Sequence, residues 1–270
     1  VAHRVARAGG NVMLVARTRS KLEVIRDEII DAGGDADVFP ADLSDIDDCE
    51  RVIKDIIEKH GQVDILVNNA GRSIRRSVAH SYDRFHDFER TMQLNYFGAL
   101  RLIMGFLPKM QEQKRGHIIN ISSIGVLTNA PRFSAYVASK SALDSFSACA
   151  ASEFIDKGVN FTTINMPLVR TPMIAPTKIY ENVPTLSPEE AADLVVEAIV
   201  YKPVRIATRL GIFGALLHAV APKATQIILN TAFRMFPDST ASQGRKDGAK
   251  DVELTPEQVA FAQITQGIHW

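Results

Sequence analysis

Six short apolar segments recur along the first 208 residues, and a stretch with helical character follows each of them. The segments are rich in β-branched residues, as in NVMLVA and HIINIS, which is typical of buried strands. They cover residues 11–16, 36–40, 64–67, 117–122, 160–166 and 204–208. Strands that alternate with helices form a parallel sheet covered on both faces. The sequence therefore predicts an α/β fold built on a doubly wound parallel sheet.

Residues 117–150 read HIINISSIGVLTNAPRFSAYVASKSALDSFSACA, a predicted strand, a polar loop and a helix from about Ser134. Tyr136 and Lys140 are four residues apart, so on a helix they share one face. A neighbouring ammonium favours the phenolate, and we expect Lys140 to lower the pKa of Tyr136. Ser123 ends the strand and can hydrogen-bond the carbonyl oxygen that Tyr136 would protonate. The stretch predicts a carbonyl/alcohol redox site, although a lone Tyr-x-x-x-Lys pair is common on helices without function.

Two further motifs lie upstream. Asn-Asn-Ala-Gly occupies Asn68–Gly71 directly after a strand, and Asn95 falls in a predicted helix between this motif and Ser123. With Tyr136 and Lys140, these motifs resemble the short-chain dehydrogenase/reductase family in identity, order and spacing. The resemblance implies a Rossmann-type fold and a catalytic tetrad of Asn95, Ser123, Tyr136 and Lys140.

The beginning of the chain departs from this family. Val1–Ala8 reads as the second half of a helix that Gly9 and Gly10 end. In the family a strand and a Gly-rich phosphate-binding turn precede that helix. Neither is present in this chain, so we expect neighbouring strands to be left unpaired. We also expect the polypeptide to be part of a longer chain.

The cofactor implied by the resemblance is NADP(H). NAD-preferring members place an acidic residue where Ala16 stands, whereas Arg17 and Arg19 can pair with a 2′-phosphate. The alternative is that both arginines belong to a solvated loop. Asp42 and Leu43 inherit an adenine contact, and Asp42 is equally well explained as a turn or capping residue. The expected cofactor-binding residues are Arg17, Arg19, Asp42, Leu43, Asn68, Asn69, Ala70, Gly71, Tyr136, Lys140, Val169 and Thr171.

Between Gly71 and Asn95 the sequence is more variable. Arg72, Arg75 and Arg76 form a basic cluster that suits either an anion site, such as one for CoA, or a solvated loop. The region from Tyr82 to Gln113 predicts one long helix carrying Asn95. By resemblance this helix and the helix of Tyr136 pack across subunits, which implies a homo-oligomer.

Two features follow the catalytic stretch. Met166 and Pro167 stand where the family usually has Pro-Gly, while Val169 and Thr171 still align with residues that meet the nicotinamide. Thr171–Leu186 is the expected substrate-covering loop. Ser187-Pro188-Glu189-Glu190 predicts a helix start with a capping box.

Residues 209–238 form an apolar appendage beyond the 1–208 reductase domain, predicted as two helices broken at Pro222. It could cover a long hydrophobic slot, rest on a membrane surface, or form a core layer or subunit interface. Four runs look like the reductase half of bacterial fatty acyl-CoA reductases: Asn165–Met173, Ser187–Ala192, Arg205–Ile212 and Arg234–Asp238. Residues 239–270 read as a polar linker and a short helix, Thr255–Gln266.

Composition excludes several function classes. Lys+Arg and Asp+Glu both number 31, so no overall field favours nucleic acid. Cys49 and Cys149 lack the spacing of a metal site, and we expect free thiols, no metal and a cytoplasmic location. The longest apolar run, Leu210–Ala221, contains His218 and is too short to span a bilayer.

These observations predict an NADPH-dependent reductase of a long-chain acyl carbonyl, either a fatty aldehyde or a fatty acyl-CoA by way of the aldehyde. By resemblance, Tyr136 is the general acid and Lys140 tunes it and holds the nicotinamide ribose. Ser123 orients the carbonyl and Asn95 holds a water in a proton relay. One alternative is a reductase of a 3-oxoacyl or steroid-like ketone. Another is a cofactor-sensing module without catalysis.

Overall fold

The computed structural model describes residues 1–172 and 185–235 of the chain. Six strands lie within these residues, and all six predicted strand segments are confirmed to within two residues at each end. The strands are β1 (Asn11–Ala16), β2 (Asp35–Pro40), β3 (Ile65–Asn68), β4 (Gly116–Ile121), β5 (Val159–Asn165) and β6 (Arg205–Ala207). Every pairing between them is parallel, as predicted.

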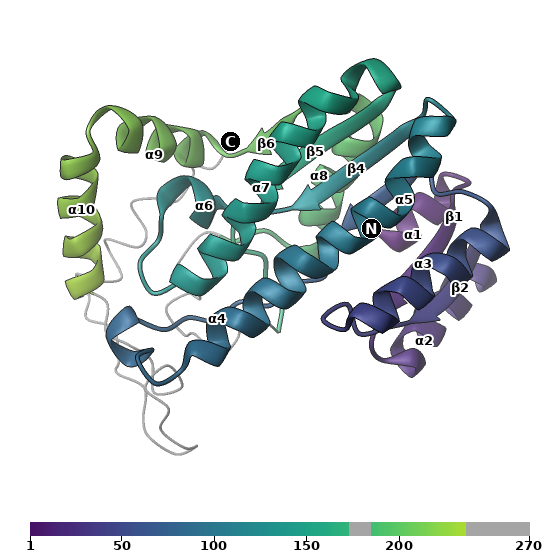
Figure 1. The fold of residues 1–270 in the computed structure, drawn as a ribbon, viewed down its shortest axis with the longest axis horizontal. Coiled ribbons are helices and arrows are strands. Elements are labelled where there is room, and N and C mark those ends of the chain that lie inside the picture. The colour runs from purple at the N-terminus through teal and green to yellow at the C-terminus, as the bar shows by residue number, and fades with distance from the viewer. Residues whose placement is uncertain (173–184, 236–270) are drawn as a thin grey trace.

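Helices connect the strands (Figure 1). They are α1 (Ala2–Arg7), α2 (Arg19–Asp31), α3 (Ile46–His60), α4 (Phe85–Met92), α5 (Ala99–Glu112), α6 (Ile124–Thr128), α7 (Ser134–Phe154), α8 (Pro188–Tyr201), α9 (Arg209–Val220) and α10 (Pro222–Met235). Two short 3₁₀ segments, η1 (Val78–His80) and η3 (Ile155–Lys157), also occur. The capping box predicted at Ser187 is present, and Pro222 separates α9 from α10 as expected.

Two predictions about helices are wrong in detail. The single regular helix expected over Tyr82–Gln113 begins at Phe85 and changes to a π-helical segment, η2 (Gln93–Gly98), before α5 continues. The loop expected after Ser123 contains the short helix α6, which Ser123 caps by accepting a hydrogen bond from the Gly125 N–H. Neither a π-turn nor a one-turn helix has a periodic signal long enough to be read from sequence.

Helices cover both faces of the sheet because successive strand residues point to opposite sides. Ile118 of β4 packs in a cluster with residues of α3, α5 and α7. Its neighbour Ile119 packs against Leu194, Val195 and Ala198 of α8 on the other face. Double burial of this kind is what makes a parallel strand read as a continuous apolar run.

The strands are divided between two sheets. One contains β1 and β2, and the other has the order β3-β4-β5-β6. Within the described residues, β1 is bonded along one edge to β2 and β3 along one edge to β4. The expectation that neighbouring strands would be left unpaired is therefore confirmed.

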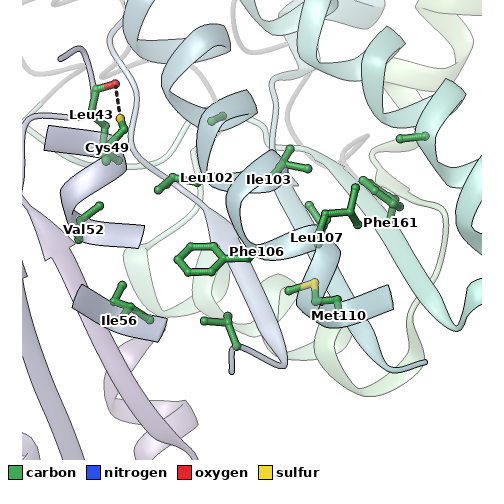
Figure 2. Packing of buried hydrophobic residues seen from close by; sticks show 14 of the residues in the cluster. Leu43, Cys49, Val52, Ile56, Leu102, Ile103, Phe106, Leu107, Met110 and Phe161 are labelled. Atoms are coloured by element: carbon green, nitrogen blue, oxygen red, sulfur yellow. Dashed lines mark hydrogen bonds between the residues drawn. The ribbon is translucent and has the colours of Figure 1, made fainter. Parts of the chain in front are cut away.

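The main core lies between α3, α5 and the sheets (Figure 2). Phe106, Leu107 and Met110 of α5 sit between Val52 and Ile56 of α3 on one side and β4 and β5 on the other. All of these side chains are at most 6% exposed. Burying them holds α5, and with it η2, at a fixed distance from the ends of the strands.

Several predictions lie outside the described residues. They concern most of the covering loop Thr171–Leu186, the linker and the terminal helix Thr255–Gln266. Among the helices that the structure does describe, none has both the length and the apolar character needed to cross a bilayer.

Candidate active site

Tyr136, Lys140 and Ser123 meet at a cavity of 380 Å³ at the carboxyl ends of β4 and β5. Tyr136 and Lys140 come from the first two turns of α7, one turn apart as predicted. Ser123 follows β4 and accepts a hydrogen bond from the Gly125 N–H at 3.1 Å. The Ser123 hydroxyl also forms a hydrogen bond with the Tyr136 hydroxyl, so these two side chains lie next to each other in the cavity.

The pKa of Tyr136 is raised above its ordinary value. Burial is the main cause, a hydrogen bond with Ser123 lowers the pKa, and the carboxylate of Asp144 raises it. The prediction that this pKa falls is therefore wrong, because desolvation of the phenolate outweighs the stabilising contacts. A buried tyrosine of this kind carries its proton at neutral pH.

Lys140 is 3% exposed, and its Nζ donates a hydrogen bond to the carbonyl oxygen of Ile121 at 2.7 Å. Burial lowers the pKa of Lys140 to about 8, while the carboxylate of Asp144 raises it. The ammonium is thus fixed at the end of β4 by the main chain. At neutral pH the amine is therefore still charged, but its pKa lies much closer to neutrality than that of an exposed lysine.

Asn95 is fully buried in η2 and holds two parts of the site together. Its Nδ2 donates to the Arg72 carbonyl oxygen at 2.8 Å and to the Ser139 hydroxyl at 2.9 Å. Its Oδ1 accepts from the Arg72 N–H at 2.7 Å. A Cβ placed on Gly71 would lie 3.4 Å from both Asn95 Oδ1 and Lys140 Nζ, so these three residues are neighbours. The side chain of Asn95 clamps the loop after β3 to α7.

The structure brings most of the expected nicotinamide-side residues to the same cavity. Asn69, Gly71, Val169 and Thr171 line it together with Ser123, Tyr136 and Lys140. Asn68 behaves differently, because it is buried and its Nδ2 donates to Asn120 Oδ1 at 2.7 Å. Its side chain therefore fastens β3 to β4. Ala70 lies exposed between Asn69 and Gly71.

The residues expected at the adenosine end lie after β1 and β2. Arg17 and Arg19 are exposed, and Arg19 pairs with Glu23 at 3.7 Å. Asp42 accepts hydrogen bonds from the Ser44 N–H at 2.9 Å and the Ser44 hydroxyl at 2.6 Å. The Ser44 hydroxyl is the main cause that lowers the pKa of Asp42, and the positive charge of Arg17 contributes. The structure thus supports the turn role of Asp42 and places Arg17 beside it.

Leu43 is buried, and its carbonyl oxygen packs directly against Gly98 of η2. A Cβ on Gly98 would be 2.2 Å from that oxygen. Glycine is required at this position because any side chain would overlap a main-chain atom. Gly98 therefore allows the Leu43 segment to pack directly on the helix that carries Asn95.

A comparison with known families agrees with this arrangement. The family model described as short chain dehydrogenase matches residues 1–181. The chain belongs to the short-chain dehydrogenase family.

Two relatives are similar to this chain in sequence over most of its length. A fatty acyl-CoA reductase of Acinetobacter baylyi is 54% identical over 270 residues, covering all of this chain and 90% of the relative. A fatty acyl-CoA reductase of Mycobacterium tuberculosis is 47% identical over 213 residues, 78% of this chain and 72% of the relative.

Solved structures of short-chain dehydrogenases have the same fold. One from Streptomyces avermitilis is 26% identical with a TM-score of 0.71, covering 86% of this chain and 92% of that one. A metagenomic short-chain oxidoreductase in complex with NADP is 32% identical with a TM-score of 0.58, covering 62% of this chain and 74% of that one.

Two arginines of the cluster Arg72, Arg75 and Arg76 have different surroundings in the structure. Arg76 lies 3.4 Å from the carboxylate of Asp87, which is 2% exposed and also contacts Arg84 at 3.2 Å and Arg90. The Arg76 side chain is only 11% exposed, so it is not part of a solvated loop. Arg72, by contrast, lines the cavity.

The apolar appendage supports the cavity wall from outside. Helix α9 packs on α6, and Gly211 and Gly214 permit close approach to Leu127 and Thr128. Among the residues described, none that line the cavity belong to α9 or α10. The Arg132 guanidinium lies 4.0 Å from the Phe233 ring centroid and donates to the Phe233 carbonyl oxygen, which ties α10 to the loop before α7.

Sequence reasoning missed four residues of the site. Ile121 and Gly125 contribute main-chain groups, Phe133 lines the cavity wall, and the Ser139 hydroxyl accepts a hydrogen bond from Asn95.

Proposed function

We propose that this protein is an NADPH-dependent reductase of a long-chain acyl carbonyl. The substrate is a fatty aldehyde, or a fatty acyl-CoA that is reduced by way of the aldehyde to the alcohol. The observation that carries this proposal is the convergence of Ser123, Tyr136 and Lys140 on a cavity with a mostly apolar wall. The apolar part of that wall consists of Ile121, Ile124, Ala130, Phe133, Val137, Met166, Pro167, Leu168 and Val169. Similarity to two fatty acyl-CoA reductases supports the acyl chain as ligand.

The residues fit NADP(H). Gly71 leaves room beside Asn95 and Lys140 that a Cβ would fill, which suits close approach of a ribose or nicotinamide. Arg17 is exposed beside Asp42 and offers a guanidinium to a 2′-phosphate. The similar structure solved with NADP supports this choice. When bound, the dinucleotide supplies the hydride.

The chain's own residues supply binding and the proton. Tyr136, which its buried position keeps protonated, donates its proton to the carbonyl oxygen as negative charge develops there. Ser123 donates a second hydrogen bond to the same oxygen. Lys140, fixed on Ile121, holds the cofactor ribose and stabilises the phenolate that forms. Asn95 keeps the loop of Arg72 in place at the site.

Reduction of a thioester requires two rounds. In the first, hydride adds to the thioester carbon, the C–S bond breaks and CoA leaves as the thiol after taking a proton. In the second, hydride adds to the aldehyde carbon and Tyr136 protonates the oxygen to give the alcohol. Each acyl-CoA would therefore require two hydrides, both of which bound NADPH would supply. Arg72 at the cavity offers a positive charge for the phosphates of CoA.

NADPH oxidation by the full-length protein tests this proposal. A long-chain aldehyde, its acyl-CoA and a 3-oxoacyl thioester are compared side by side, with Tyr136→Phe as the inactive control. We expect turnover of the aldehyde or the acyl-CoA and a loss of about 10²–10⁴-fold in Tyr136→Phe. Turnover of the oxo-thioester alone would assign the protein to ketone reduction instead. Wild-type turnover by Tyr136→Phe would overturn the assigned mechanism.

We further propose that the α9–α10 appendage contacts anionic membrane surfaces. Ile212, Phe213 and Leu216 of α9 are each more than half exposed. Residues 209–235 contain Arg209, Lys223 and Arg234 but no Asp or Glu. A helix pair with exposed apolar side chains and basic charge suits the interface of an anionic bilayer. Co-sedimentation with phosphatidylglycerol vesicles but not with phosphatidylcholine vesicles is the expected result.

A homo-oligomer is also part of this proposal. Phe97 of η2 and Met104 of α5 are 42% and 58% exposed on the helix expected to pack across subunits. Sedimentation velocity of the wild type and of Met104→Lys tests it. A monomer at micromolar concentration in the wild type would contradict an interface on α5.

A further inference from the structure

Asp144 lies one turn after Lys140 on α7, and both side chains are buried. Asp144 is 8% exposed and Lys140 is 3% exposed. One carboxylate oxygen, Oδ2, accepts a hydrogen bond from Asn165 Nδ2 at 3.2 Å. The other oxygen, Oδ1, is buried and makes no hydrogen bond within the part of the chain that the structure describes.

Asn165 connects this carboxylate to the catalytic serine. Its Nδ2 also lies 3.3 Å from the Ser123 carbonyl oxygen and 3.4 Å from the Ser122 hydroxyl. Its Oδ1 accepts a hydrogen bond from Arg205 Nη1 at 2.8 Å. Asn165 therefore joins α7, the junction between β4 and α6, and β6. The main chain of Ser123 is fixed at this crossing point.

The groups that face Asp144 can be named from each element packed around it. Lys140 lies on α7, Ser122 follows β4, Asn165 ends β5 and Arg205 begins β6. Burial raises the pKa of Asp144, and these four neighbours lower it. A buried carboxylate with an unsatisfied oxygen destabilises the fold compared with an apolar residue of similar size at the same position. Groups of this kind concentrate at functional sites.

The charge of Asp144 acts on two catalytic groups in a useful direction. It opposes the effect of burial on Lys140, so it favours the ammonium. It also favours the protonated hydroxyl of Tyr136. Both are the forms that a reductase needs before the proton is transferred.

We propose that Asp144 is a positioning residue of this site, which keeps Lys140 charged and, through Asn165, fixes the main chain of Ser123. The inference rests on the proposed function. In that function, loss of the Lys140 charge sets the upper pH limit of carbonyl reduction, and Asp144 raises this limit. Asp144 acts through other residues and does not itself contact the reacting atoms.

The test compares Asp144→Asn with Glu153→Gln in the full-length protein. Asp144→Asn keeps the shape and the acceptor for Asn165 but removes the charge. Glu153→Gln makes the same change at an exposed position of α7. Protonation of Lys140 is followed by NMR of ¹³Cε-labelled lysines without cofactor, the resonance being assigned from its loss in Lys140→Met. This readout does not depend on which substrate the enzyme reduces, so it separates the inference from the proposed function.

We expect the Lys140 midpoint, near 8 in the wild type, to fall by about one pH unit in Asp144→Asn and to stay in place in Glu153→Gln. The alkaline limb of the pH–rate profile for carbonyl reduction moves by the same amount. Asp144→Glu, which restores the charge, returns the midpoint toward 8. An unchanged midpoint in Asp144→Asn would overturn the proposal.

A second variant tests the link that Asn165 makes between Asp144 and Ser123. It also keeps the proposal testable if Asp144→Asn does not fold. Asn165→Ser keeps the carboxylate but removes the link to Ser123. We expect a loss of about 10-fold in kcat with an unchanged KM for NADPH, because the main chain of Ser123 loses its support. Wild-type kcat in a folded Asn165→Ser protein would contradict the positioning role. Circular dichroism of each variant confirms folding.

Discussion

The Nζ of Lys140 lies 2.7 Å from the carbonyl oxygen of Ile121, the last residue of β4. This contact joins α7, which carries Tyr136 and Lys140, to the strand that leads to Ser123. The ammonium is held by one main-chain acceptor in a buried position, and its pKa falls to about 8 because of that burial. The site thus keeps a charged group where the fold would be more stable without the charge.

Replacement of Lys140 by Met is expected to stabilise the protein at neutral pH while abolishing activity. The folded-state pKa of about 8 lies below the unfolded value of 10.5, so the unfolded chain binds the additional proton between these values. The cost to the wild type is therefore full below pH 8 and disappears as pH rises toward 10.5. A pKa shift of this size corresponds to a gain of about 3 kcal/mol in the free energy of unfolding of Lys140→Met. Loss of the hydrogen bond to Ile121 reduces this gain by about 1 kcal/mol.

Urea unfolding of the wild type and Lys140→Met at pH 7, 8, 9 and 10 measures this difference. Lys109→Met, at a half-exposed position of α5, is the matched control. A gap between the wild type and Lys140→Met that does not change with pH would contradict the assigned origin of the effect.

His117 of β4 is expected to make the fold sensitive to acid. It is 2% exposed, and its Nε2 lies 2.8 Å from the hydroxyl of Thr162, which itself donates to the Pro203 carbonyl oxygen. Nε2 therefore carries the proton and donates it to Thr162. Burial, with a contribution from Lys202, lowers the pKa of His117 to about 4.

Between pH 6.5 and 4 the unfolded chain binds a proton at His117 that the folded protein does not, so stability falls as pH falls. The loss attributable to His117 is about 3 kcal/mol across this interval. We expect His117→Gln to show a correspondingly flatter dependence of the free energy of unfolding on pH. His218→Gln, on the exposed surface of α9, should leave the wild-type slope unchanged. Equal slopes for all three proteins would exclude this role of His117.

Removal of the Asp87 charge is expected to destabilise the packing of α4 against the loop that carries Arg76. The carboxylate is 2% exposed and contacts Arg76, Arg84 and Arg90. In Asp87→Asn these cations would face one another without a counter-charge, at a cost of about 3 kcal/mol. Chemical unfolding measures it, and Asp83→Asn, an exposed position in the same segment, is the control. A change below 1 kcal/mol in Asp87→Asn would show that solvent screens the cluster.

Gly98→Ala is expected to weaken both the fold and cofactor binding. The added Cβ would lie 2.2 Å from the Leu43 carbonyl oxygen, so η2 and the Leu43 segment must move apart. Overpacking of this kind costs about 1–3 kcal/mol. Under the proposed function, the affinity for NADPH falls as well, because Leu43 is expected at the adenine. Thermal unfolding and fluorescence titration with NADPH measure the two effects.

The control for Gly98→Ala is Gly214→Ala on α9, where the new Cβ would lie 3.1 Å from a methyl group of Thr128. We expect a small effect there because a side chain can adjust and alanine favours helix. Similar losses in both variants would indicate a general cost of substituting helical glycine. The Leu43 contact would then carry no special weight.

The sequence by itself determined the order of the elements and the spacing of the residues that we propose for catalysis. Short apolar runs located all six strands, and the spacing of Tyr136 and Lys140 placed them one turn apart on α7. The capping box at Ser187 and the break at Pro222 were equally local. Each of these signals depends on residues close together in the chain, where hydrogen bonding and side-chain periodicity are decided by near neighbours.

Tertiary structure alone decided what surrounds Ser123, Tyr136 and Lys140. The pKa of Tyr136 is raised because α7 packs it into the fold, although the adjacent lysine suggested the opposite. Asn95 sits in a π-turn and binds Arg72, Asn68 pairs with Asn120, and Arg76 pairs with Asp87. Burial and contacts between residues distant in sequence depend on how the layers pack, and no local pattern records them.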